Sequence, residues 1–220
     1  MNVDFISHLN KKIDRVNVDG LSKLLKPSNY IDTYEQPLAA CELICYNLLQ
    51  LLKSKGININ TPKVEPWIPD RFITSNYNIR YMNPVVIIDD VGIHTQIKSD
   101  EVIENAKVPD WIYYFDRWVG RLDGDSNLLL LPNNEVISID YELCFPWVCT
   151  RPPVYKKIND LDVKYNPMIK QSASEKSKQI IKSLSDNEIW SVVTNVPKEM
   201  IASSTLVGIW SGLCERKKLL

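Results

Sequence analysis

One hairpin pattern near the middle of the chain constrains the fold more than any other stretch. A leucine run at 128–131 is followed by Pro-Asn-Asn and then by a second apolar-rich segment at 135–139. Asparagine tolerates the left-handed backbone of a tight turn, so Asn133-Asn134 is predicted to be a two-residue turn. The resulting register sets Asn127 directly opposite Asp140. Facing residues have Cβ atoms about 4.5–5.5 Å apart, which is close enough to share one cation.

The apolar flanks predict a buried hairpin with polar groups at its open end. An amide oxygen and a carboxylate are hard oxygen ligands, which suit Mg²⁺ that carries phosphates. Taken alone, Asn127 and Asp140 could simply cap a turn and the element that follows. A third acid, Asp123, lies just upstream, after a predicted helix rich in aromatic residues. An acid, an amide and a second acid in this order are what phosphoryl transfer requires.

The surrounding residues carry a resemblance to a known family. The run Phe115-Asp-Arg-Trp-Val-Gly-Arg-Leu-Asp123, followed by Asn127 and by Ile139-Asp140, resembles the HipA-like kinases. The resemblance implies that Asp123 is catalytic and orients an acceptor hydroxyl, while Asn127 and Asp140 hold the metal. It also implies ATP and Mg²⁺ as cofactors, and a protein partner or substrate phosphorylated on Ser or Thr.

The resemblance extends more weakly toward the amino terminus. Within the predicted helix, Glu42 is the candidate partner of an ATP-binding lysine, and Lys26, sixteen residues earlier, is the candidate lysine. In an alternative alignment, residues 30–33 occupy the strand and no lysine remains. Only the stretch 20–23, Gly-Leu-Ser-Lys, hints at a glycine-rich phosphate loop.

Two departures from the family pattern leave other hypotheses open. The loop from Asp123 to Asn127 is one residue shorter than is usual in the family, and Gly124 replaces the basic residue that normally follows the acid. The second hypothesis is therefore a pseudokinase, or a nucleotide-gated protein-interaction module without phosphotransfer. A third is a partner-binding domain unrelated to kinases.

The resemblance implies an α+β, kinase-like two-lobed fold. Residues 1–90 would form a reduced amino-terminal lobe with a short sheet plus helix 38–54, and residues 91–220 a mainly helical carboxyl-terminal lobe carrying the hairpin. Periodicity and punctuation residues predict the individual elements. The predicted strands are 15–18, 22–25 and 84–88; the predicted helices are 38–53, 98–107, one after Pro109, one with a capping box of Ser185 and Glu188, one from Pro197 and one over 204–216.

Composition narrows the function classes. Lys and Arg number 26 against 27 Asp and Glu, so no positive excess indicates a nucleic-acid partner or an acidic membrane surface. No apolar stretch is long enough to span a bilayer. Five cysteines, an odd number in a chain without an export signal, predict reduced thiols and a cytoplasmic protein. Cys41 and Cys45 share one helix face and are expected to pack in the core.

Overall fold

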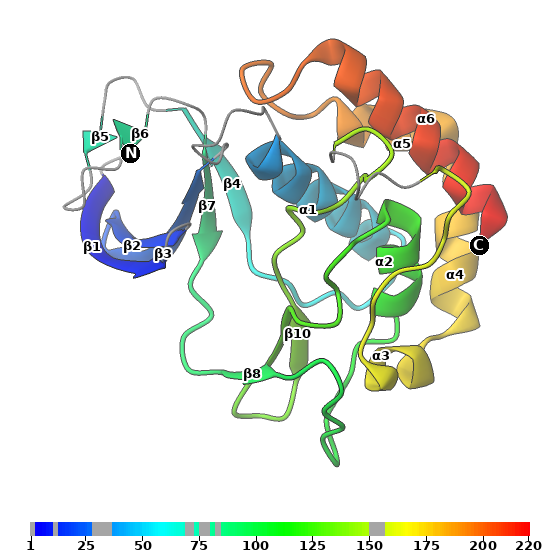
Figure 1. Cartoon of the computed structure of the whole chain (residues 1–220), viewed down its shortest axis with the longest axis horizontal. Coiled ribbons are helices and arrows are strands. Elements are labelled where there is room, and N and C mark those ends of the chain that lie inside the picture. Colours follow the sequence, from blue (N-terminus) through cyan, green and yellow to red (C-terminus); the bar gives the residue numbers. More distant parts are fainter. Residues whose placement is uncertain are drawn as a thin grey trace.

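A curved sheet and a group of helices form the two sides of the molecule, with helix α1 (Leu38–Ser54) between them (Figure 1). The computed structural model describes residues 3–10, 13–27, 37–68, 73–74, 80–81, 85–149 and 157–220. The alternative strand at residues 30–33 lies outside these ranges. No helix within them combines the length and the apolar character that a membrane crossing needs.

The main sheet has five antiparallel strands in the order β1-β2-β3-β7-β4. Asp19 and Gly20, with φ values of 51° and 89°, form the tight turn between β2 and β3, a backbone that suits Gly and Asp. The predicted strands at 15–18, 22–25 and 84–88 are confirmed at their centres. The strand bounds are β1 (Val3–Asn10), β2 (Ile13–Val18), β3 (Leu21–Pro27), β4 (Val64–Trp67) and β7 (Val85–Asp89), and a separate small pair is β5 (Ile73–Thr74) with β6 (Arg80–Tyr81).

Side chains alternate between the two faces of this sheet, as strand geometry requires. One face carries a small buried cluster of its own, made of Val16, Val18, Leu25, Val85 and Ile87. The opposite face packs on α1 through residues that include Val64 and Val86. Because Lys26 pairs with Val86 across β3 and β7, the lysine lies on the same face as α1.

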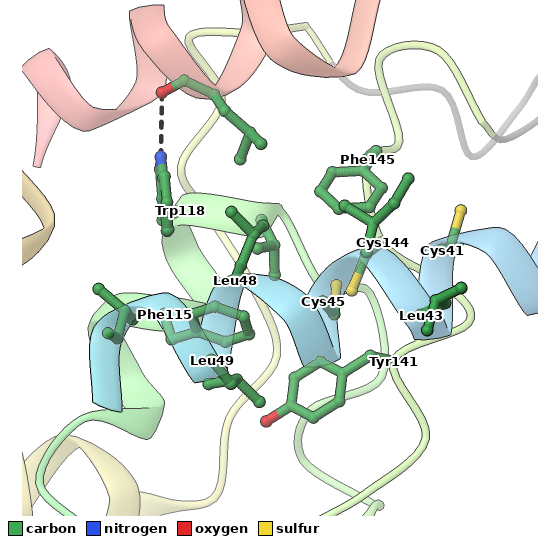
Figure 2. Packing of buried hydrophobic residues seen from close by; sticks show 14 of the residues in the cluster. Cys41, Leu43, Cys45, Leu48, Leu49, Phe115, Trp118, Tyr141, Cys144 and Phe145 are labelled. Atoms are coloured by element: carbon green, nitrogen blue, oxygen red, sulfur yellow. Dashed lines mark hydrogen bonds between the residues drawn. The ribbon is translucent and has the colours of Figure 1, made fainter. Parts of the chain in front are cut away.

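Helix α1 follows the predicted bounds closely and joins the sheet to the rest of the core. Figure 2 shows its Cys45, Leu48 and Leu49 packed among aromatic side chains from later in the chain. Cys41 and Cys45 are fully buried, as the helical spacing predicted. Trp118 is also fully buried, and its indole N–H donates to the Leu213 carbonyl at 2.9 Å. One continuous apolar core therefore connects α1 with the helical half of the molecule.

Helices α2 to α6 make up the other half in the described part of the chain. Ser185 and Glu188 exchange hydrogen bonds at the start of α5, which confirms the predicted capping box. The predicted helix over 98–107 is wrong: Asn105 has a φ of 62°, and Lys107 bridges to Glu135 beside the hairpin. The predicted helix from Pro197 is also wrong: residues 197–200 form a turn, in which Met200 donates its N–H to the Pro197 carbonyl at 3.0 Å. The helices are α2 (Ile112–Val119), α3 (Pro167–Ser172), α4 (Glu175–Ser183), α5 (Asp186–Val193) and α6 (Ser203–Leu219).

The predicted hairpin exists as β9 (Leu128–Leu130) and β10 (Val136–Ser138), with β8 (Thr95–Ile97) as a third strand. Its predicted register is wrong by one residue. Val136 pairs with Leu130 and Ser138 with Leu128, so continuation of the ladder sets Ile139, not Asp140, opposite Asn127.

The turn explains the shift. Leu131 donates its N–H to the Glu135 carbonyl at 2.9 Å, so three residues, including Pro132, form the turn. Asn134 alone takes the left-handed backbone, with a φ of 62°. Three-residue hairpin turns commonly end in such a residue, whereas the prediction assumed that both asparagines were left-handed.

Candidate active site

A cavity of about 210 Å³ lies between the inner face of the main sheet, α1 and the open end of the β9–β10 hairpin. Leu24 and Ile88 line it from the sheet, and Leu129 and Ile139 line it from the hairpin. Lys26, Glu42 and Asp140 also line it. A cavity that combines apolar walls with a small set of charged groups is the usual form of a small-molecule site.

Lys26 contacts three carboxylates at or beside this cavity. Its Nζ lies 3.2 Å from Glu42 Oε2, 2.5 Å from Asp140 Oδ1 and 3.3 Å from Glu142 Oε2. Its side chain is only 6% exposed. Burial alone would lower the pKa of Lys26, but the three carboxylates raise it above its ordinary value. The lysine is therefore held as a cation by three carboxylates from two separate stretches of sequence, α1 and residues 140–142.

Glu42 connects α1 to the segment that follows the hairpin. Besides contacting Lys26, its Oε2 accepts the backbone N–H of Tyr141 at 2.9 Å. Burial raises the pKa of Glu42, and Lys26 opposes that effect. A single carboxylate thus fixes the lysine from β3 and the backbone next to Asp140 at the same time.

Asp123 lies in the loop after α2, which ends at Gly120 in the left-handed conformation. The carboxylate of Asp123 accepts a hydrogen bond from the side-chain amide of Asn127 at 2.7 Å. Burial raises the pKa of Asp123, the nearby Arg121 lowers it, and Asp140 raises it further. Asp123 and Asp140 therefore lie close enough to interact electrostatically.

Asn127 and Asp140 do not face each other across the hairpin as predicted. The amide of Asn127 is directed to Asp123, while the carboxylate of Asp140 contacts Lys26. Asp140 lies two residues beyond the end of β10 and has a φ of 65°. Because its backbone is not that of a strand, the alternation of side chains along β10 does not determine where its carboxylate points. The structure brings Lys26, Glu42 and Asp140 together at the cavity, and it pairs Asp123 with Asn127, neither of which is among the cavity-lining residues.

Gly124 stands where the HipA-like pattern has a basic residue, and the structure gives a steric reason for the glycine. A Cβ at this position would lie 2.6 Å from Asp116 Oδ2 and 3.0 Å from the Lys164 carbonyl. Contacts below 3.0 Å cannot be accommodated without movement of a neighbour, and Asp116 is fully buried. Only glycine therefore fits after Asp123 without a shift of Asp116 or of the backbone at Lys164.

The stretch 20–23 is not a phosphate loop at this cavity. Gly20 belongs to the turn between β2 and β3, is exposed, and is not among the cavity-lining residues. The cavity instead reaches the opposite end of that strand pair, at Ile13 and Lys26.

Two residues of the site were not predicted. Glu142 contacts Lys26 although nothing in its sequence context distinguishes it. Arg121, which lies inside the run that carried the resemblance, interacts with both Asp116 and Asp123. One indication of a role for Arg121 was present in the sequence, namely its position two residues before Asp123.

Comparisons with known proteins agree with this geometry at the level of the fold. No protein-family model and no curated protein sequence matches the chain. The structure is similar to a crystal structure of the Helicobacter pylori proinflammatory kinase CtkA, with a TM-score of 0.55 and 12% sequence identity. The match covers 100% of this chain and 92% of that chain. The chain accordingly has a kinase-like two-lobed α+β fold; membership of the HipA-like family in particular stays a prediction.

Proposed function

We propose that this chain binds Mg²⁺-ATP in the cavity between its two lobes and transfers the γ-phosphoryl group to a hydroxyl of a protein Ser or Thr. The observation that carries the proposal is the 3.2 Å contact between Lys26 on β3 and Glu42 on α1, with Asp140 on the same amine. In protein kinases an equivalent strand-to-helix ion pair positions the nucleotide phosphates. The lobes correspond to residues 1–90 and 91–220 in this proposal.

In this proposal the oxygen donors beside the cavity bind a magnesium ion that carries the phosphates. Three carboxylates surround one lysine, which leaves negative charge that a hard divalent cation would neutralise. Asp140 and Asn127 would hold the metal, and Lys26 would bind phosphate oxygens while Glu42 keeps it in place. Bound Mg²⁺ would neutralise charge that develops on the phosphates. Leu24, Ile88 and Leu129, which line the cavity, would pack against the adenine ring of ATP.

Asp123 would receive or orient the acceptor hydroxyl proton. Its carboxylate is held by the Asn127 amide at 2.7 Å, so it is positioned before any substrate arrives. A raised pKa makes the carboxylate a better proton acceptor, because the efficiency of a general base increases as its pKa approaches the operating pH.

Phosphate transfer from γ-labelled ATP to the chain itself and to a generic protein substrate tests the proposal. Asp140→Ala should remove Mg²⁺-dependent thermal stabilisation by ATP, while Asp123→Ala should keep that stabilisation and lose transfer. Asp100→Asn, at an exposed position, is the matched control and should behave like the wild type. If both alanine variants bind and transfer as the wild type does, the assigned roles are wrong.

One observation favours a second candidate, a nucleotide-gated interaction module without phosphotransfer. Asn127 is engaged with Asp123 rather than facing Asp140, so the metal ligands are not assembled as in the predicted pairing. This candidate predicts a thermal shift with Mg²⁺-ATP and no transfer in the same assay. The free, buried cysteines are consistent with a cytoplasmic location for either candidate.

A further inference from the structure

Arg121 is a fully buried charged side chain that contacts residues of the proposed site, yet the proposed chemistry assigns it no part. Its guanidinium contacts two segments whose relative position matters for the proposed phosphate transfer. One is the loop that carries Asp123. The other is the stretch 138–141, which leads out of the hairpin and includes Asp140.

Arg121 binds the second segment through several contacts. One terminal nitrogen donates to Ser138 Oγ at 2.5 Å. The other donates to the carbonyls of Ile139 and Asp140, the latter at 3.2 Å. The guanidinium also lies over the Tyr141 ring, 4.2 Å from its centroid. The backbone on both sides of Asp140 is therefore tied to one planar group.

The same guanidinium faces two carboxylates on the loop side. Its Nη1 lies 3.6 Å from Asp116 and its Nε lies 3.7 Å from Asp123. Asp116 is fully buried, and within the described part of the chain its carboxylate oxygens accept no hydrogen bond, so Arg121 is its charge partner. A buried arginine needs a matching charge and acceptors for its N–H groups. The two acids provide the charge, and segment 138–141 provides acceptors for both terminal nitrogens, while Nε faces Asp123 at 3.7 Å without a hydrogen bond.

We propose that Arg121 is a positioning residue: it sets the distance between the loop that carries Asp123 and the proposed metal ligand Asn127 and the backbone of the other proposed ligand, Asp140, and hence the affinity of the site for Mg²⁺. The inference rests on the proposed function for its ligand, but its structural part stands on the contacts of Arg121 alone. Mutation of a residue that hydrogen-bonds to a metal ligand, without touching the metal itself, typically lowers metal affinity about 10- to 100-fold. Lysine has a single compact charge and cannot bind several acceptors in one plane, so Arg121→Lys should keep the charge and lose the alignment.

Arg216 offers a matched control. It is also fully buried, donates to the backbone carbonyls of Trp118, Ile158 and Asp160, and lies over the Trp147 ring at 4.9 Å. None of these residues lines the cavity. Arg216→Lys should therefore lower stability without a specific effect on the metal.

The test is a Mg²⁺ titration of binding of a non-hydrolysable ATP analogue to each folded variant. Arg121→Lys should raise the Mg²⁺ concentration at half-saturation about tenfold and leave metal-free nucleotide binding unchanged, whereas Arg216→Lys should match the wild type. Ser138→Ala, which removes one acceptor of Arg121, is a milder variant and should move the midpoint in the same direction. Should Arg121→Lys and Ser138→Ala both keep the wild-type midpoint, the positioning role is refuted.

Hydrogen exchange of the nucleotide-free protein separates this inference from the proposed function. If the wild type binds no nucleotide, the proposed function fails. The structural part of the inference still predicts faster exchange at both 122–127 and 139–141 in Arg121→Lys, relative to Arg216→Lys. Unchanged exchange in either stretch would overturn it.

Discussion

Lys26 is buried among three carboxylates, so its charge and theirs depend on one another. Removal of one member of a buried ion pair leaves an uncompensated charge and typically costs about 3–5 kcal/mol. Here a missing lysine would leave Glu42, Asp140 and Glu142 in mutual repulsion. The resemblance to the HipA-like kinases made Lys26 and Glu42 a candidate pair on sequence grounds, with residues 30–33 as the alternative strand, but Glu142 follows from the three-dimensional arrangement only.

The first residue-scale prediction is that Lys26→Met lowers the free energy of unfolding at pH 7 by about 3 kcal/mol, measured by urea denaturation. The double variant Lys26→Met with Glu42→Gln should recover part of that loss, because it removes one of the repelling charges. Lys63→Met is the control: Lys63 pairs with Glu65 in solvent and should matter little. An equal loss in the single and double variants would contradict the account.

Asp116 gives a pH-dependent prediction. Burial raises the pKa of Asp116 to about 6, with Arg121 opposing the shift and Asp123 adding to it. A raised carboxyl pKa means that the folded state binds the proton more tightly than the unfolded state does. The contribution of Asp116 to stability is therefore greatest below pH 4 and is lost as the pH rises through about 6.

The difference of about two in pKa corresponds to about 3 kcal/mol. Unfolding free energies of the wild type and Asp116→Asn, measured from pH 4 to pH 7, should thus diverge: the wild type should lose about that much more than the variant. Parallel curves would show that Asp116 keeps its ordinary pKa in the folded protein.

At the scale of single elements, long patterns were predicted well and short irregular ones were not. The helical spacing of Leu48, Leu49 and Leu52 predicted α1, because one face of a helix must be buried. The hairpin was also predicted, but its register depended on whether the turn had two or three residues. That choice rests on one backbone angle at Asn134, which local sequence does not determine.

The turn makes an element-scale prediction. Asn134 has a φ of 62°, a conformation that costs other L-residues about 1–2 kcal/mol and β-branched residues the most. Asn134→Val should lower the unfolding free energy by about that amount, while Asn134→Gly at the same exposed position should cost nothing. Thermal or urea denaturation measures both. Equal stability of the two variants would mean that Asn134 does not hold the left-handed backbone.

On the scale of the whole molecule, the site is an assembly of distant segments. Lys26 and Asp140 are separated by 114 residues along the chain, and α1 joins the sheet to the helical half through a shared core. Sequence analysis predicted the kinase-like fold from the motif between Phe115 and Asp140, and the structure confirms that fold. It could not predict that Asn127 contacts Asp123 instead of facing Asp140, because that depends on the one-residue register of the hairpin and on the backbone of Asp140.

The most direct test of the central claim is calorimetric titration of ATP into the wild-type protein and Asp140→Asn, each with and without Mg²⁺. The proposed function predicts that Mg²⁺ strengthens ATP binding to the wild type and that this gain is lost in Asp140→Asn, whose neutral amide can still reach Lys26. Failure of the wild type to bind ATP with Mg²⁺ present, or an equal gain from Mg²⁺ in both proteins, would contradict it.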